Sequence, residues 1–168
     1  MKHTLKISLI IITVLVLLLS LSLPIIGVLR IRKMLSEDRF TKDEVFSLVH
    51  EHENTILDDI HKMLVAEDGF PDHVPAEHLQ NSRKIIEIKD ISIASNYLKF
   101  YCGGAGMGGQ TSYSGFYYFV SADAFNEYIG RCGYTHEGNG YIRRELDGDN
   151  ESYLEPITDN FYYYEEKY

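Results

Sequence analysis

The residues best suited to chemistry lie in residues 100–119, FYCGGAGMGGQTSYSGFYYF, where two aromatic, strand-like segments flank a glycine-rich connection. Glycine permits positive φ and close backbone approach, and consecutive amides can form an anion-binding nest. The run is neither a GxGxxG nor a Walker motif, because it lacks the Lys-Ser/Thr pair and no helix follows it. We therefore predict a flexible hairpin loop. The candidate binding residues are Gly103, Gly104, Gly106, Gly108, Gly109 and Tyr113.

A cysteine nucleophile is the second chemistry to consider. Such a nucleophile needs a base that takes its proton or lowers its pKa. The candidate nucleophile is Cys102 and the candidate base is His136, because both are expected near strand ends. No GxSxG or SxxK signature is present. The sequence favours a protein without enzymatic activity, and the alternative is a cell-envelope hydrolase using Cys102 and His136. Cys102 and Cys132 could instead form a disulfide outside the cytoplasm, or remain as small buried apolar side chains.

Carboxylates at alternate positions are the third candidate chemistry. Asp147, Asp149 and Glu151 resemble the start of a calcium loop, where a hard cation takes several oxygen ligands around a tight turn. The sixth position is Ser152 instead of glycine, and the twelfth is Thr158 instead of glutamate. We interpret the segment as a solvated acidic turn, with a cation-binding acidic domain as the alternative. Nothing in the sequence predicts a cofactor.

An uncharged apolar run occupies residues 7–29. About 20 helical residues span the hydrocarbon core of a bilayer, so the run predicts a transmembrane anchor. A cleaved signal peptide is the alternative, but a small-residue A-x-A-like cleavage site is lacking. The predicted organisation is a basic tail (1–6), the anchor (7–29), a juxtamembrane link (30–40) and a single soluble domain (41–168).

The orientation of this anchor depends on two opposing signals. Arg30, Arg32 and Lys33 follow the run, whereas Lys2 and Lys6 precede it, and this count slightly favours a cytoplasmic domain. A charged N-terminal region followed by one apolar run is, however, typical of exported chains. We therefore predict a single-pass protein of the cell membrane with an extracytoplasmic domain.

Charge is distributed unevenly along the chain. All 25 acidic residues follow residue 33, together with 11 of the 16 lysines and arginines, so the part after residue 33 has a net charge of −14. Because this part lacks a basic stripe, nucleic acid is not expected as a partner. The chain contains 13 tyrosines and no tryptophan, and tyrosine is well suited to binding surfaces.

The elements that position these residues begin with a helix. Thr41 and Glu44 have the spacing of a capping box, and apolar residues then recur at helical spacing as far as about Ala66. The residues of this apolar stripe are Val45, Val49, Ile56, Ile60 and Met63.

A change to strand-like composition follows from Lys84. Ser121 is expected to cap a short helix through Ile129 with Gly130 at its C′ position. The expected strands cover about residues 84–93, 97–102, 113–120, 134–137, 141–146, 153–155 and 161–165. The predicted fold class is α+β, with an amphipathic helix followed by a mainly antiparallel β-meander. We expect consecutive strands to pair, and one face of the sheet to be wet and to display tyrosines.

The run FYCGGAGMGGQTSYSGFYY, behind an N-terminal anchor and ahead of NFYYYEEKY, resembles small membrane-anchored proteins of unknown function from Gram-positive bacteria. The resemblance implies a surface-tethered α+β domain and no activity or catalytic residue. The function that we predict is a tethered interaction module whose partner, an unknown protein or envelope component, meets the glycine-rich segment.

Overall fold

The computed structural model describes residues 40–66, 71, 78–94, 96–107 and 110–168. These residues belong to one compact unit, Asp38–Tyr168. The predicted basic tail, the anchor at residues 7–29 and residues 30–39 of the link lie outside the described residues. Among the described residues, no helix has the length and hydropathy needed to span a bilayer.

Helix α2 (Lys42–Ala66) begins at the predicted capping box. The backbone N–H of Thr41 donates to the Glu44 carboxylate at 2.8 Å, and the Glu44 N–H donates back to the Thr41 hydroxyl at 3.4 Å. The backbone hydrogen bond from Thr41 lowers the pKa of Glu44 below its ordinary value. All five positions of the predicted apolar stripe are buried, which confirms the periodicity argument.

Seven strands form one antiparallel sheet in the order β1-β2-β3-β7-β6-β5-β4. The strands are β1 (Asp90–Ala94), β2 (Tyr97–Met107), β3 (Gln110–Phe119), β4 (Thr135–Glu137), β5 (Gly140–Arg144), β6 (Glu151–Pro156) and β7 (Phe161–Lys167). Helix α3 (Ala122–Cys132) connects β3 to β4, and a short 3-10 helix, η1 (Ser82–Lys84), precedes β1.

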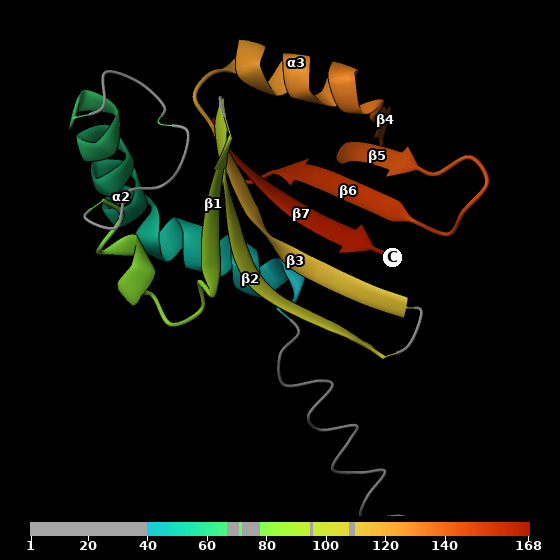
Figure 1. Cartoon of the computed structure of the whole chain (residues 1–168), viewed down its shortest axis with the longest axis horizontal. Coiled ribbons are helices and arrows are strands. Elements are labelled where there is room, and N and C mark those ends of the chain that lie inside the picture. The colour runs from blue at the N-terminus through green and yellow to red at the C-terminus, as the bar shows by residue number, and fades with distance from the viewer. Residues whose placement is uncertain (1–39, 67–70, 72–77, 95, 108–109) are drawn as a thin grey trace, which may run out of the picture. The chain divides into compact units, whose positions relative to one another are not determined.

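The α+β class is confirmed, but the sheet is not one continuous meander. Five of the six described pairings join strands that are consecutive in sequence, and the sixth pairs β3 with β7. The chain leaves β3 through α3, enters the far edge at β4 and returns strand by strand until β7 closes against β3 (Figure 1). The two aromatic strands therefore lie side by side at the centre of the sheet.

Both faces of this central region are covered, contrary to the prediction of a wet face displaying tyrosines. Phe116 and Tyr118 of β3 belong to the same buried cluster as the apolar stripe of α2, whereas Tyr117 and Phe119 belong to the cluster of α3. Strands that are buried on both faces have continuous apolar runs instead of alternation, and the runs FYYF and FYYY fit that pattern. Six of the 13 tyrosines are consequently buried core residues.

Several predicted boundaries are corrected by the structure. The strand expected from Lys84 begins at Asp90, and Ile86 is 81% exposed in the segment before it. The side chain of Ser121 accepts from the Ala124 N–H, which confirms the predicted N-cap. The helix ends at Gly133, with φ of 74°, so Gly130 is an interior residue and not the C′ residue.

Candidate binding site

The glycine-rich segment is a paired strand and not the predicted flexible loop. Gly103, Gly104 and Gly106 lie in β2, opposite Ser114, Tyr113 and Thr111 of β3. Met107 pairs with Gln110, so only residues 108–109 connect the strands, and the predicted Gly108 and Gly109 lie outside the described residues.

Close approach of the two strands explains these glycines. A Cβ atom on Gly104 would lie 2.7 Å from the Ser112 carbonyl oxygen, and one on Gly106 would lie 2.5 Å from Thr111 Cα. Real Cβ atoms essentially never come so close to backbone, so the residues are needed for packing within the hairpin.

The sheet is hollowed near the β2–β3 hairpin, on the same face that α3 covers at the other end of these strands. One hollow has a volume of about 300 Å³. It is lined by Asp90, Ser92, Lys99, Tyr101, Tyr113, Tyr164 and Glu166. A neighbouring hollow of about 200 Å³ is lined by Tyr101, Gly104, Ala105, Gly106, Thr111 and Tyr113. The rings of Tyr101 and Tyr113 line both hollows and meet edge to face at 6.0 Å. We call the two hollows together the tyrosine hollow.

An ion pair stiffens the floor of the tyrosine hollow. The ammonium group of Lys99 contacts both carboxylate oxygens of Glu166 at 2.8 Å, and their side chains are 27% and 13% exposed. The same ammonium group lies 4.5 Å from the ring centroid of Tyr164, a cation–π contact. The charges of Lys99 and Glu166 are therefore already paired with each other.

The hydroxyl of Tyr164 is the exception to this pairing. It is buried and has no hydrogen-bond partner among the described residues. Burial, and secondarily the carboxylate of Glu166, raise the pKa of Tyr164 far above its ordinary value, so the hydroxyl remains a neutral donor. A buried orphan hydroxyl within a lining residue is a typical feature of a place where water or a ligand binds.

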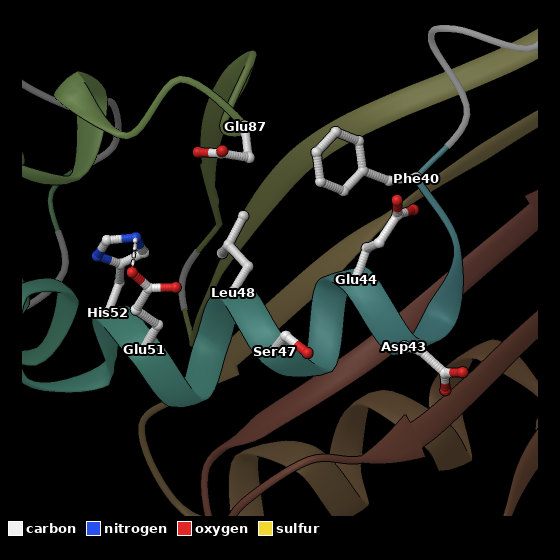
Figure 2. A pocket seen from close by; sticks show the side chains of 8 residues that line it. All are labelled: Phe40, Asp43, Glu44, Ser47, Leu48, Glu51, His52 and Glu87. Atoms are coloured by element: carbon white, nitrogen blue, oxygen red, sulfur yellow. Dashed lines mark ion pairs between the residues drawn. The ribbon is translucent and has the colours of Figure 1, made fainter.

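The opposite face of the sheet carries an acidic groove of about 390 Å³ beside the first turns of α2. Its lining residues are Phe40, Asp43, Glu44, Ser47, Leu48, Glu51, His52 and Glu87 (Figure 2). Four of these residues are carboxylates, and the only basic group among them is His52, whose Nε2 lies 4.0 Å from Glu51 Oε1. Glu87 comes from a segment distant from α2 in the chain, so the acidic groove could not be predicted from the sequence.

No match to this chain was found among protein-family models, curated proteins or solved structures. The interpretation of the site therefore depends on its own geometry. Two hollowed surfaces, aromatic on one face and acidic on the other, are suited to binding a partner.

The predicted catalytic pair is not assembled. Cys102 is fully buried in the cluster with α2, whereas His136 lies exposed on the edge strand β4. Four strands separate β2 from β4, a distance of about 24 Å at the ordinary spacing of strands. Burial, and secondarily the carboxylate of Glu87, raise the pKa of Cys102 to about 12. The structure thus does not bring Cys102 and His136 together as a nucleophile and its base.

The predicted disulfide is also absent. Cys102 and Cys132 are free, and they belong to buried clusters on opposite faces of the sheet. The sheet lies between them, so the alternative of two packed free cysteines holds for this structure.

These positions predict a sharp difference in thiol reactivity. Cys102 is expected to resist iodoacetamide at pH 7.5 in the folded, reduced protein, because a buried thiol with a raised pKa forms almost no thiolate. Half-buried Cys132 should be alkylated first. Mass spectrometry of timed digests measures both sites, with a denatured sample as the control. Equal labelling of both thiols in the folded protein would contradict the burial of Cys102.

The predicted acidic turn does not converge on a cation site. Asp147 and Asp149 are exposed, while Glu151 pairs with Arg144 at 3.2 Å and with Lys167 at 3.3 Å. Within the described ranges, no group of three His, Cys, Asp or Glu side chains is placed to hold a metal ion. The interpretation as a solvated turn agrees with this arrangement.

Proposed function

We propose that this chain is a single-pass membrane protein whose domain at residues 41–168 is a binding module outside the cytoplasm. The uncharged run at residues 7–29 supports the anchor, and the charged N-terminal stretch before it supports export. The net charge of −14 after residue 33 keeps the domain away from anionic headgroups.

The observation that carries this proposal is the open end of the sheet at the β2–β3 hairpin. The tyrosine hollow lies on one face of this end and the acidic groove lies near it on the other. Tyr113 is 39% exposed, which is unusual in a chain whose other aromatic residues are mostly core residues. Tyrosine offers a large contact area with a polar tip, and exposed aromatic anchors often contribute most to binding free energy.

Partner capture by the full-length protein in its own membranes tests the proposal. Chemical crosslinking followed by affinity purification should recover a partner with the unmodified chain, and Tyr113→Ala should reduce the recovery about tenfold or more, as expected for an interface anchor. Ile86→Ala is the matched control, because Ile86 is exposed in a different segment. Equal recovery with both variants would refute a binding role for the tyrosine hollow.

Exposure of the domain on intact cells tests its location. Protease added outside should degrade residues 41–168 without permeabilisation if the domain is extracytoplasmic. Protection until the cells are permeabilised would refute the proposed orientation.

A further inference from the structure

Strand β2 is longer than its outer neighbour. Strand β1 pairs with β2 only from Ala94, opposite Tyr97, to Asp90, opposite Tyr101. Strand β3 pairs with β2 further along, as far as Met107. Residues 103–107 therefore have a strand partner on the β3 side and none on the other side within the described part of the chain. This leaves an open, glycine-rich backbone edge, and open edges are templates for strand pairing.

The register shows which backbone groups face this edge. Thr111 exchanges both of its backbone hydrogen bonds with Tyr168, at 2.8 Å each, so its N–H and C=O point away from β2. Gly106 lies opposite Thr111 in the antiparallel ladder of β2 and β3. Because the backbone groups of Thr111 point away from β2, Gly106 and Thr111 form a non-hydrogen-bonded pair. The N–H and C=O of Gly106, and those of Gly104 two residues earlier, consequently point to the open edge.

The acidic groove ends beside the same edge. Ser114, which pairs with Gly103, donates its hydroxyl to the Phe40 carbonyl at 2.8 Å. At the other side of the groove, Glu87 lies two residues before Lys89, whose N–H donates to the Tyr101 carbonyl at 2.8 Å. Figure 2 shows Phe40 and Glu87 on either side of the opening, with Leu48 of α2 between them.

We propose that an extended basic peptide segment of a partner protein adds as a strand to the edge at Gly104 and Gly106. This inference rests on the proposed binding function and specifies its mode. Neighbouring strands place directly opposite residues on the same face, so partner side chains opposite the two glycines enter the tyrosine hollow. The alternate side chains, opposite Ala105 and Gly103, point to the face of the acidic groove.

The negative charge of the acidic groove favours a basic peptide segment. Asp43, Glu44, Glu51 and Glu87 line the groove, and the chain after residue 33 has a net charge of −14. A second copy of this acidic chain would meet repulsion at the same edge, and an acidic peptide would as well. Lysine or arginine at alternate positions satisfies both the pairing geometry and the charge.

The full-length chain in detergent micelles tests the proposal with the peptide acetyl-Lys-Tyr-Lys-Tyr-Lys-amide. Its matched control is the same peptide with the backbone amide nitrogen of each tyrosine methylated. This change keeps the charge and removes the two N–H donors that would face Gly104 and Gly106. We expect the methylated peptide to bind about thirtyfold more weakly, as the loss of two hydrogen bonds implies. Amide hydrogen exchange of residues 103–107 should slow only with the unmodified peptide.

Charge variants test the groove independently. The double variant Glu51→Gln, Glu87→Gln should weaken peptide binding about five- to tenfold at low salt. The control is Asp147→Asn, Asp149→Asn, which changes the net charge equally but on an exposed turn. This control should change peptide binding less than about twofold. Equal binding of the two peptides, or equal weakening by the two double variants, would overturn the strand-addition mode. A peptide-independent dimer in solution that slows exchange at residues 103–107 would overturn it too, by assigning the edge to a second copy. If these tests fail while Tyr113→Ala still abolishes partner capture, the proposed binding function stands without this mode.

Discussion

Replacing Asp59 with alanine is expected to lower the free energy of unfolding by about 3 kcal/mol or more. Asp59 is a buried carboxylate on α2 that accepts four hydrogen bonds from two residues of the segment before β1. The donors are the N–H and side-chain amide of Asn81, each at 2.9 Å, and the N–H and hydroxyl of Ser82, at 2.7 and 3.0 Å. Removing the acceptor leaves the two buried donors of Ser82 unsatisfied, and each costs about 1–3 kcal/mol.

Thermal unfolding followed by circular dichroism measures this effect, and a decrease in Tm of about 10 °C is expected for a domain of this size. Asp58→Ala is the matched control, because Asp58 is exposed and, among the described residues, its ion pair is with Lys62 on the same helix. That variant should change the free energy of unfolding by less than about 0.5 kcal/mol. Equal stability of the two variants would contradict the role of Asp59 in holding the segment against α2.

Local patterns explain which parts of the fold were predictable. The start of α2 follows from Thr41 and Glu44, which lie three residues apart, and its buried stripe follows from periodicity. The importance of Asp59 could not be predicted in this way. Its partners, Asn81 and Ser82, are about twenty residues away, and an aspartate in a polar stretch of helix looks like a solvated residue.

Long-range pairing explains the parts that sequence reasoning missed. The aromatic runs ending at Phe119 and starting at Phe161 were predicted as strands, but nothing local shows that they pair with each other. That pairing puts tyrosines on both covered faces of the sheet. The glycines of β2 were predicted as a loop because their need for close approach appears only when β3 is placed opposite them. The candidate binding residues Gly104, Gly106 and Tyr113 line a hollow in the structure, and their role in binding stays a prediction.

Replacing Gly115 with alanine is expected to cost about 3 kcal/mol or more and to disturb the tyrosine hollow. Gly115 lies in β3, between Tyr101 of β2 and Tyr164 of β7 in the register of the sheet. A Cβ atom there would lie 2.0 Å from the Phe100 carbonyl oxygen and 3.0 Å from the ring of Tyr164. Backbone on the neighbouring strand cannot move aside without loss of ladder hydrogen bonds, so the strain of overpacking reaches the upper end of its usual range.

Gly130→Ala is the matched control and should act in the opposite direction. Apart from its chain neighbours and the adjacent helix backbone, no heavy atom lies within 4 Å of a Cβ placed on Gly130, which is exposed inside α3. Alanine is favoured over glycine in a helix by about 0.5–1 kcal/mol, so this variant should raise Tm slightly. Urea unfolding gives both free energies, and peptide binding measured at a temperature where both variants are folded shows whether the hollow changes. Because Lys99 and Glu166 meet on the floor beside Gly115, displacement of Tyr164 should weaken binding even where the fold survives. Unchanged stability in Gly115→Ala would contradict the close approach of β2 and β3, on which both the glycine-rich strand and the open edge depend.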